Sequence, residues 1–398
     1  MRASLLLFLV AIFLVVSCTE MPEGTSGSAS AELLAFAGGR GGTSSGSGSG
    51  TGSGQSKSGV ITAAEWNDLN HWNFWKELIE SDEFSKMPTY WSFFHSNRIS
   101  VRVRDGNGNP ATNVLVQLKR ESGVVFTAVT DNSGMAELWI DLFQKKSNVD
   151  LLQYRIDVGS GLKYSDHILP FEQGINEFVI PQEILAQNRI EVSFVVDATG
   201  SMGDELEYLK TELYDVITRS KANNPNSTVS LSSVFYRDIG DEYVTKLSPF
   251  TSDVTATIDF IKKQSAAGGG DFPEAVHTAL DKAINELQWT TEAKTKLIFL
   301  MLDAPPHYDN EVIANLQLSV MKASLTGIKI IPITASGIDK ETEFLMRFMA
   351  ISTQGTYVFI TDDSGIGNEH LKASVGEYEV EYLNDLMVRL IDKYSSNF

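Results

Sequence analysis

Three oxygen-bearing side chains at alternate positions, those of Asp197, Thr199 and Ser201, follow an apolar run in this 398-residue chain. A carboxylate and two hydroxyls are the hard ligands that a hard divalent cation prefers. The apolar run of residues 190–196 predicts a buried strand, so the three side chains emerge at its carboxyl end. Ligands of open α/β sheets usually bind at that end, and the spacing therefore predicts a cation site there.

Two further segments carry oxygen ligands. The loop Gly268-Gly-Gly-Asp-Phe-Pro-Glu274 opens a helical segment, and Asp303 ends the apolar run of residues 297–302. Because the carboxyl ends of parallel strands meet at one edge of a sheet, we expect these segments to meet the first one. Each segment alone also suits a plainer role, since Asp197 and Ser201 can cap the following helix and Asp303 can accept hydrogen bonds from loop amides.

Apolar segments of strand and helix type alternate from about residue 187 onward. The strand-type runs are residues 191–196, 229–236, 297–302, 328–333 and 356–360. Between the first two runs, Leu206, Leu209 and Leu213 recur at helical spacing, which predicts a helix with one apolar face. The alternation predicts a doubly wound, mostly parallel α/β sheet.

Two segments before this region differ from it in composition. Residues 61–97 are dense in aromatic side chains, and we expect them to be helical and packed into a core, with binding of a sugar or a partner as the alternative. Thr62 and Glu65 form a capping-box pattern, which predicts a helix over about residues 63–79. Residues 98–182 alternate apolar and polar positions between glycine-containing turns, which predicts a small all-β sandwich.

The N-terminal residues have the composition of an export signal. Residues 1–17 carry Arg2 and then an apolar run too short for a membrane span, which indicates a signal peptide. The run ends in Val15-Val16-Ser17-Cys18, which resembles the lipobox of bacterial lipoproteins. The resemblance implies cleavage before Cys18 and lipidation of that residue. Residues 18–60 are rich in Gly and Ser and predict a flexible tether.

The three oxygen-bearing segments, in their order along residues 188–395, resemble a von Willebrand factor type A domain. The glycine-rich loop, followed by a strand that runs into Leu302-Asp-Ala304, is most similar to the hemicentin-type branch of that family. The resemblance implies a metal-ion-dependent adhesion site. In it, Asp197, Thr199 and Ser201 match the family's Asp-x-Ser-x-Ser, and Asp303 matches its distal Asp.

One position departs from the family pattern. Most of these domains place a Thr after the Gly pair of the loop, and here that position is Gly270, which has no side-chain oxygen. We expect Asp271 to supply the missing metal contact, directly or through water, with Glu274 as the reserve. A carboxylate in place of a neutral hydroxyl would tighten metal binding and weaken the pull of the metal on an incoming carboxylate.

The predicted sandwich also resembles a known domain. Residues 108–114 read Gly-Asn-Pro-Ala-x-x-Val and residues 130–134 read Thr-Asp-x-x-Gly. This pattern is similar to the carboxypeptidase-regulatory-like β-sandwich, an accessory domain of exported bacterial proteins. The implied order of parts is a lipid anchor, a tether, an aromatic-rich helical segment, a sandwich and a terminal binding domain.

Charge and motifs together favour binding over other functions. The net charge of −19 argues against nucleic acid and anionic membrane surfaces as partners. We therefore expect a lipid-anchored binding protein of the cell envelope, whose Mg²⁺ (or Mn²⁺ or Ca²⁺) holds an acidic side chain of a protein partner. Thr19 follows the cysteine, so the acidic retention signal of some bacteria is absent, and we expect the outer membrane.

Two other functions remain open at this point. A structural or assembly subunit of an envelope complex would keep the fold with a vestigial metal site. A metal-dependent hydrolase is less expected, because the chain shows no Ser-His-Asp order, no zinc-ligand spacing and no phosphate loop. Thr199 also stands where phosphatases of the haloacid-dehalogenase type usually carry a second acid. The expectation is therefore a protein that is not an enzyme.

The roles of four nearby residues are not decided by the sequence. Arg237 and Asp238 end another predicted strand, and His307 closely follows Asp303. Each of them can face the site or stabilise a loop. His277 lies on the helix after the glycine-rich loop, and we expect it to be packed or exposed rather than a ligand.

Overall fold

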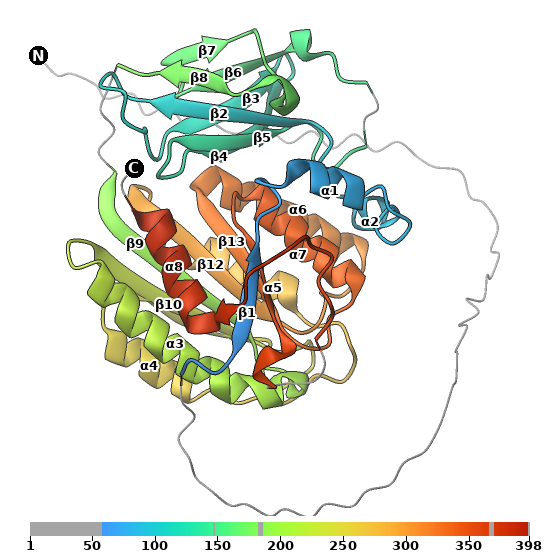
Figure 1. Ribbon diagram of the computed structural model, residues 1–398, viewed down its shortest axis with the longest axis vertical. Helices are drawn as coiled ribbons and strands as arrows, with labels where there is room; N and C mark the ends of the chain where they lie inside the picture. The colour runs from blue at the N-terminus through green and yellow to red at the C-terminus, as the bar shows by residue number, and fades with distance from the viewer. Residues whose placement is uncertain (1–57, 146–147, 182–185, 366–369, 397–398) are drawn as a thin grey trace, which may run out of the picture. The chain divides into compact units, whose positions relative to one another are not determined.

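The computed structural model describes residues 58–145, 148–181, 186–365 and 370–396 (Figure 1). The predicted signal peptide, Cys18 and nearly all of the predicted tether lie outside the described residues. Within the described ranges, no helix combines the length and the apolar character needed to cross a membrane.

An eight-stranded sheet, with strand order β11-β10-β9-β12-β13-β14-β1-β15, is the centre of the fold. Its parallel strands are β9 (Gln187–Asp197), β10 (Thr228–Tyr236), β12 (Ala293–Leu302), β13 (Ile328–Thr334) and β14 (Tyr357–Ile360). The antiparallel strands are β11 (Thr245–Thr251), β1 (Thr62–Trp66) and β15 (Glu381–Tyr382). The predicted doubly wound, mostly parallel α/β sheet is confirmed.

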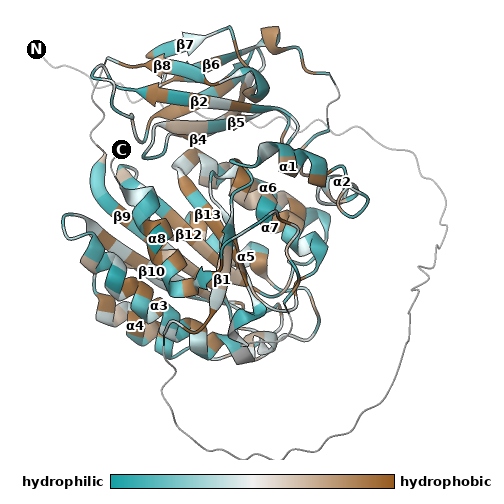
Figure 2. Ribbon diagram, viewed as in Figure 1, coloured by the Kyte–Doolittle hydropathy of each residue, from teal (hydrophilic) through white to brown (hydrophobic). Residues whose placement is uncertain are grey.

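Helices cover both faces of this sheet. One layer contains α3 (Gly203–Asn223), α4 (Val254–Lys262) and α8 (Leu383–Ser395), and the other contains α5 (Val276–Asp281), α6 (Asn310–Thr326) and α7 (Lys340–Ser352). Successive strand side chains point to opposite faces. In β9, Phe194 packs with the first layer, whereas Val195 packs with the second. Both faces of β9 therefore carry apolar side chains that pack under helices. Figure 2 shows hydrophobic residues along the neighbouring strands β12 and β13.

Strand β1 is the main departure from the sequence prediction. It pairs with β14 on one side and β15 on the other, and helix α1 (Trp72–Leu78) begins only after it. The helix predicted over residues 63–79 was therefore wrong in its first part. A local capping pattern does not register long-range strand pairing, and that pairing decides the conformation here. Glu65, expected in a capping box, instead accepts hydrogen bonds from Arg389 and Lys393.

The buried carboxylate of Glu212 in α3 holds the chain where it enters β1. It accepts hydrogen bonds from the backbone N atoms of Gly59, Val60 and Ile61 at 3.0, 3.1 and 3.3 Å. Because β1 runs antiparallel to β14, this entry point lies at the edge where the parallel strands end. The chain therefore enters the sheet at the edge that also carries the predicted metal ligands.

The predicted β-sandwich is present and is inserted between β1 and β9. One sheet has the order β5-β2-β8, formed by β5 (Met135–Trp139), β2 (Arg98–Arg104) and β8 (Asn176–Val179). The other has the order β4-β3-β6-β7, formed by β4 (Gly123–Val129), β3 (Leu115–Arg120), β6 (Tyr154–Val158) and β7 (Lys163–Ser165). Asn113 Nδ2 donates to the Ala293 carbonyl at 2.9 Å and so joins the sandwich to β12.

The aromatic-rich segment is part of a core, as predicted from the sequence. Trp75 of α1 stacks on Phe344 of α7, with ring centroids 5.8 Å apart. Phe93, which follows α2 (Met87–Trp91), stacks on Phe348 at 4.3 Å. The aromatic-rich segment therefore packs against α7.

Candidate metal centre

The neighbouring parallel strands β9 and β12 end at the same edge of the sheet (Figure 1), and an acidic residue stands at the end of each. Asp197 is the last residue of β9, and Asp303 directly follows β12, the parallel neighbour of β9. The chain leaves β9 toward β10 on one side and later returns to β12 on the other, so the strand order reverses between them. Open α/β sheets bind ligands at such a point. Both side chains are buried, with exposed fractions of 0% and 4%.

The segment after β9 is folded around the Asp197 carboxylate. The backbone N and the hydroxyl of Thr199 both donate to Asp197 Oδ1, at 2.8 and 2.7 Å. The hydroxyl oxygens of Thr199 and Ser201 lie 3.1 Å apart. Thr199 is buried and Ser201 is exposed, and the nearby Ser201 side chain partly offsets the rise in the pKa of Asp303. The structure thus brings Asp197, Thr199, Ser201 and Asp303 together, as the sequence predicts.

The glycine-rich loop adds Glu274 to this group. Gly268 and Gly269 have φ values of 79° and 70°, in the left-handed region that favours glycine. A Cβ atom built on Gly269 would lie 2.7 Å from Glu274 Oε1 and 3.1 Å from Thr199 Cβ. The Glu274 carboxylate and Thr199 therefore flank the same glycine. The backbone N of Glu274 donates to the Pro305 carbonyl at 2.8 Å, which fixes the end of the loop beside Asp303.

Burial and neighbouring carboxylates raise the pKa values of all three carboxyl groups. Burial, and then the charge of Asp303, raises the pKa of Asp197 to about 7. Burial raises the pKa of Asp303 to about 6, and the charge of Glu205 adds to the effect. Burial raises the pKa of Glu274 to about 9, followed by the charges of Asp197, Asp238, Asp303 and Asp241. Proximity of like charges in a buried place disfavours ionisation of all three groups.

Each of these carboxyl groups has an oxygen without a partner. Asp197 Oδ2, Glu274 Oε2 and Asp303 Oδ1 are buried and accept no hydrogen bond from the described residues. None of the three groups forms an ion pair with a Lys or Arg in that part of the chain. Buried acidic groups in this state fit a bound cation, which would neutralise them.

The hydroxyl groups are necessary to the fit. In the described ranges, no group of three or more His, Cys, Asp or Glu side chains is arranged to hold a metal ion. A cation at this edge therefore depends on Thr199 and Ser201 as well as on the carboxylates. Hydroxyl and carboxylate oxygens together are a donor set for Mg²⁺, Mn²⁺ or Ca²⁺ rather than for a metal that prefers nitrogen or sulfur.

Asp271 is the predicted ligand that the structure does not bring to the group. Its side chain is exposed, and its charge is not among those that raise the pKa values of Asp197, Glu274 or Asp303. The hydrogen bond from the Glu274 backbone N to the Pro305 carbonyl holds the end of the loop beside Asp303. Glu274, the second choice from the sequence, is therefore the acidic residue of the loop that turns inward. A Cβ atom on Gly270 would meet nothing within 4 Å, and no side chain replaces the missing threonine there.

Residues left open by the sequence hold the surrounding loops. Arg237 donates from Nε to the Ala198 carbonyl at 3.2 Å and from Nη2 to the Ser265 carbonyl at 2.8 Å. His307 Nε2 lies 2.6 Å from Asp238 Oδ1. His277 is buried beside Thr278, as a packed residue.

Two functional neighbours were missed from the sequence. Glu205 of α3 is buried, and its Oε1 accepts a hydrogen bond from the Ser336 backbone N at 3.2 Å. His370 Nε2 lies 3.3 Å from the same oxygen, and His370 Nδ1 lies 2.7 Å from Asp362 Oδ1. Glu205 thereby connects α3 to the loops after β13 and β14. Its position one turn into an amphipathic helix gives no signal of this role.

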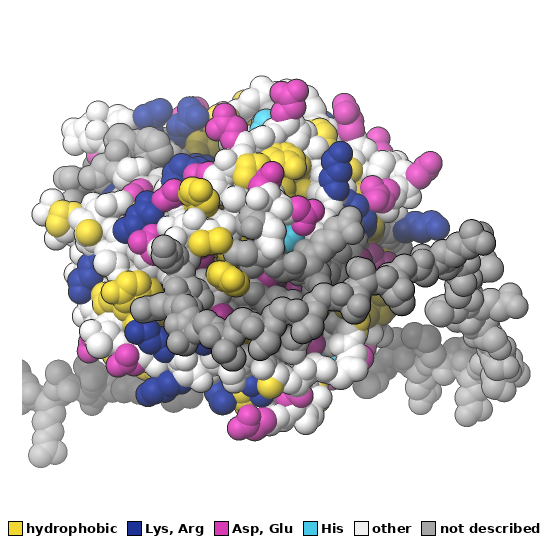
Figure 3. Space-filling model, turned by 60° about the horizontal axis from the view of Figure 1, so that its bottom comes forward, with side chains coloured by type: hydrophobic (Ala, Val, Ile, Leu, Met, Phe, Trp, Pro, Cys, Tyr) yellow, Lys and Arg dark blue, Asp and Glu magenta, His cyan; other side chains and the backbone are white. Residues whose placement is uncertain are grey.

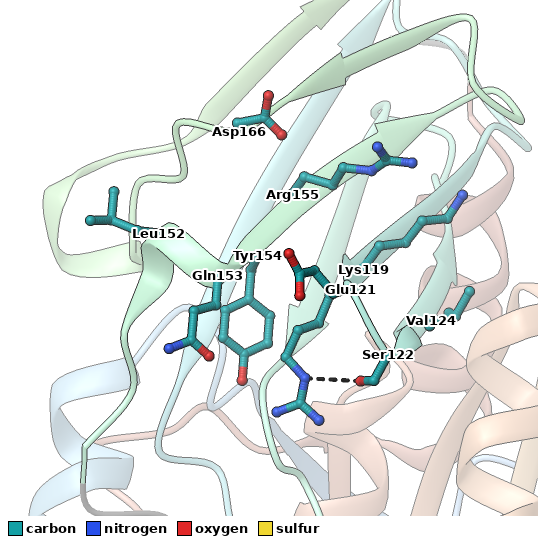
Figure 4. Close-up of a pocket in the computed structure, with 11 residues that line it drawn as sticks. Lys119, Glu121, Ser122, Val124, Leu152, Gln153, Tyr154, Arg155 and Asp166 are labelled. Atoms are coloured by element: carbon teal, nitrogen blue, oxygen red, sulfur yellow. Dashed lines mark hydrogen bonds between the residues drawn. The ribbon is translucent and has the colours of Figure 1, made fainter.

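A hollow on the β-sandwich is a separate feature (Figure 4). Lys119 Nζ and Arg155 Nε lie 2.5 and 3.1 Å from oxygens of Asp157. Arg120 Nε donates to Ser122 Oγ at 3.1 Å. These cationic groups already have partners within the protein. The hollow is therefore a weaker candidate for a ligand site than the carboxyl groups at the sheet edge.

Two curated proteins are similar to part of this chain. An ariadne-like RING finger protein of Acanthamoeba polyphaga mimivirus is 33% identical over 119 residues, which are 30% of this chain and 11% of that protein. The alpha-protein kinase vwkA of Dictyostelium discoideum is 28% identical over 127 residues, which are 31% of this chain and 20% of the kinase. The chain thus spans only a small part of the length of these relatives.

Two solved structures are also similar. The conserved hypothetical protein BatB of Bacteroides thetaiotaomicron is 15% identical with a TM-score of 0.36, over 52% of this chain and 98% of that one. An aerotolerance-related membrane protein of Bacteroides fragilis, with multiple mutations to serine, is 15% identical with a TM-score of 0.33, over 52% of this chain and 100% of that one. Likeness at this level adds nothing to the argument on function.

Family models match two regions of the chain. Residues 83–156 match the macroglobulin domain MG4. The resemblance of the β-sandwich to the carboxypeptidase-regulatory-like domain, inferred from the turn motifs, stays a prediction. Residues 191–366 match the von Willebrand factor A domain. This match begins in β9 and contains Asp197, Thr199, Ser201, Glu274 and Asp303. The chain is therefore a protein that contains a von Willebrand factor A domain.

Proposed function

We propose that the cluster of Asp197, Thr199, Ser201, Glu274 and Asp303, hereafter the metal cluster, holds a divalent cation. Mg²⁺ is the expected ion, with Mn²⁺ or Ca²⁺ as alternatives. One observation carries this proposal: three buried carboxyl groups lie on neighbouring segments at one edge of the sheet, each with an unpartnered oxygen and a raised pKa. Such a group is costly to bury unless a positive charge is added to it.

The function that this cluster supports best is cation-dependent binding of a partner's acidic side chain. A bound divalent cation supplies a positive, oxygen-seeking centre at the open end of the cluster. Ser201 is the exposed member, so the cluster opens to solvent on its side. Thr199 fixes Asp197 through two hydrogen bonds and so holds one carboxylate ready. Glu274 adds negative charge, which favours the cation and moderates its pull on a partner carboxylate.

We further propose that the protein is a lipid-anchored component of the bacterial cell envelope, in the outer membrane. The support is the sequence of residues 1–18, with its export signal and Cys18, and the Gly/Ser-rich stretch that follows. The chain enters the sheet at the edge that carries the metal cluster. A partner bound there would lie close to the point where the tether joins the domain.

A second candidate is a structural or assembly subunit with a vestigial metal site. Two observations favour this second candidate. Gly270 stands in place of a hydroxyl-bearing residue, and a cation would need hydroxyl ligands in addition to the carboxylates. No catalytic role is proposed for either candidate.

Partner binding in the presence and absence of the cation distinguishes the two candidates. The bait is the protein from Ser58 onward, immobilised and stripped with EDTA, and the sample is a bacterial envelope extract with or without Mg²⁺. Binding that appears with Mg²⁺ and disappears in the Asp303→Asn variant supports adhesion. A partner retained equally in EDTA would support the assembly subunit and contradict cation-dependent binding.

A further inference from the structure

The eight-stranded sheet ends, on the side of β1, at a strand of only two residues. Strand β15 lies outermost and pairs with β1 through Thr62 and Ala63. Strands β13, β14 and β1 separate it from β12, so at about 4.8 Å per strand it lies roughly 19 Å from the strand that precedes Asp303. This edge is therefore remote from the metal cluster. An outermost strand presents unpaired backbone N–H and C=O groups, which are a template for a further strand.

The segment that leads into β15, residues 377–380, has unpaired backbone groups of its own. None of its backbone N atoms donates a hydrogen bond to a described residue. Directly after β15, Leu383 N donates to the Ile61 carbonyl at 2.8 Å, so the segment runs into a paired strand. Residues 377–382 are therefore an edge on which a second extended chain can form hydrogen bonds.

Contacts with α7 and with the sheet hold this segment in place. Ser374, just before it, donates from its backbone N to Glu343 Oε1 at 2.7 Å. Its carbonyl accepts a hydrogen bond from Arg347 Nη1, also at 2.7 Å. The Tyr378 ring stands edge-on to that of Phe359 of β14, with ring centroids 5.0 Å apart. A segment that is already ordered loses little conformational entropy when a second chain pairs with it.

Apolar and acidic side chains alternate along this edge. Tyr378, Val380 and Tyr382 are 41%, 43% and 49% exposed, and Glu377 and Glu379 are exposed as well. Exposed apolar side chains alone are ordinary: on the lower end of the molecule, shown in Figure 3, they lie among acidic and basic ones. Three of them at alternate positions of an unpaired edge match the side-chain period of a strand.

The charge of the edge follows from which acidic groups already have partners. The basic side chains of α8 beside it are engaged within the protein, in the pairs Arg389–Glu381, Arg389–Glu65 and Lys393–Glu65. Among the described residues, neither Glu377 nor Glu379 forms an ion pair. Lys372 is exposed but stands five residues before Glu377. The edge therefore keeps an excess of negative charge where its apolar side chains are exposed.

We propose that residues 377–382, hereafter the docking edge, bind an extended segment of a partner protein, which adds a strand beside β15. That segment carries basic and apolar side chains at alternate positions. The basic ones complement Glu377 and Glu379, and the apolar ones cover the exposed Tyr and Val side chains. A second copy of this chain suits the docking edge less well, because its net charge is −19. The inference is independent of the proposed function, since no residue of the metal cluster takes part.

Fluorescence anisotropy with labelled peptides tests the proposal on the chain from Thr19 onward, in EDTA. The first peptide alternates Lys and Val, and the second alternates Glu and Val. The third has the Lys and Val residues of the first in two separate blocks, and the fourth is the first with its backbone N–H groups methylated. The first should bind about tenfold more tightly than each of the others. Three of the peptides carry the same charge, so attraction to an acidic protein alone would not separate them.

Changes in the docking edge should weaken the binding of the first peptide. Glu377→Gln together with Glu379→Gln should weaken it by roughly two- to fivefold and reduce its salt dependence. Val380→Ser should weaken it by about threefold. Hydrogen exchange at the amides of residues 377–380, which have no partner among the described residues, should slow when the peptide binds.

Two controls change similar side chains elsewhere. Leu318→Ser alters a 67% exposed apolar residue of α6, and Glu80→Gln together with Glu83→Gln removes two exposed charges that follow α1. Both should bind every peptide like the unaltered protein. Equal binding of the three basic peptides, or edge variants that behave like the controls, would overturn the docking edge. So would protection of residues 377–380 that appears without peptide as the protein concentration rises, because a second copy would then be the occupant.

Discussion

Glu274 Oε1 lies so close to Gly269 that a Cβ atom added to the glycine would be only 2.7 Å from this oxygen, closer than van der Waals contact allows. Gly269→Ala must therefore displace the Glu274 carboxylate, and it also places a Cβ on a residue with φ of 70°. We expect a loss of about 1–2 kcal/mol in the free energy of unfolding, from the left-handed backbone alone. Urea denaturation measures it.

Gly270→Ala is the control for that change, because a Cβ on Gly270 meets no atom within 4 Å. Its φ is also outside the positive range. It should leave both the stability and the response to Mg²⁺ nearly unchanged. Equal losses in the two variants would show that Gly269 is not a special position in the loop.

Glu274 and Asp271 form a matched pair for the choice of ligand. Glu274→Gln removes a buried carboxyl group that can ionise when the cation binds, and we expect the Mg²⁺ affinity to fall by about tenfold, which corresponds to about 1.4 kcal/mol. Asp271→Asn removes an exposed charge, and we expect a change of about twofold or less. Calorimetric titration with Mg²⁺ compares them. A larger loss in Asp271→Asn would restore the ligand assignment made from the sequence.

The metal-free protein should lose stability as the pH rises. The carboxyl pKa values are 3.8 for an ordinary Asp and 4.5 for an ordinary Glu, against about 7 for Asp197, about 6 for Asp303 and about 9 for Glu274 in the fold. Between those limits the folded chain binds more protons than the unfolded one, so stability falls with increasing pH. The stabilising contribution of the protonated groups is fully present at a pH below their pKa values in the unfolded chain. It is lost as the pH rises through their pKa values in the folded protein.

Melting temperatures measured in EDTA from acidic to mildly alkaline pH check this dependence. Saturating Mg²⁺ should oppose the fall, because a cation favours the ionised carboxylates. Asp303→Asn should show a shallower dependence in EDTA, since it removes one of the repelling charges. A melting temperature that rises over the same pH range in EDTA would contradict the electrostatic description of the cluster.

The ion pair between Arg347 and Asp68 joins α7 to the segment after β1. Arg347 donates from Nε to Asp68 Oδ2 at 2.9 Å and from Nη2 to Asp68 Oδ1 at 2.6 Å. Its Nη1 also donates to Glu343 Oε1, and all three side chains are buried. Arg347→Met leaves the buried Asp68 without its cation and leaves Glu343 with Lys340 alone. We expect a loss of about 3–5 kcal/mol in the free energy of unfolding.

Arg102→Met is the corresponding change at an exposed pair. Arg102 and Glu177 have side chains that are 32% and 51% exposed, so the expected loss is within about 1 kcal/mol. Chemical denaturation of both variants gives the comparison. Similar small losses in the two would mean that the buried pair is replaced without cost.

The fold of the sheet and most of the metal cluster follow from short-range features of the sequence. Asp197 and Asp303 end apolar runs, and the parallel order of the strands brings strand ends together, so their meeting is predictable. Glu274 was ranked behind Asp271, because spacing alone does not show which carboxylate turns inward. That choice is made by the bond from Glu274 N to the Pro305 carbonyl, on a different loop.

The conformation of β1 was beyond reach for a related reason. Its residues carry a plausible helix-capping pattern, but their partners lie far along the chain: Thr62 pairs with Tyr382, and Ala63 pairs with Ile360 and Glu381. Glu212, which receives the chain before β1, sits on an ordinary amphipathic helix. Neither relationship leaves a local pattern, so only the assembled sheet shows them.

Calorimetric titration of EDTA-stripped protein with Mg²⁺ at neutral pH tests the central claim most directly. We predict saturable binding that is lost in Asp303→Asn. We also predict proton release on binding, because Glu274 with a pKa of about 9 and Asp197 with a pKa of about 7 carry protons that the cation displaces. The measured heat should therefore differ between buffers of different ionisation enthalpy. Absence of saturable heat, or the same heat in Asp303→Asn as in the unaltered protein, would contradict the metal cluster.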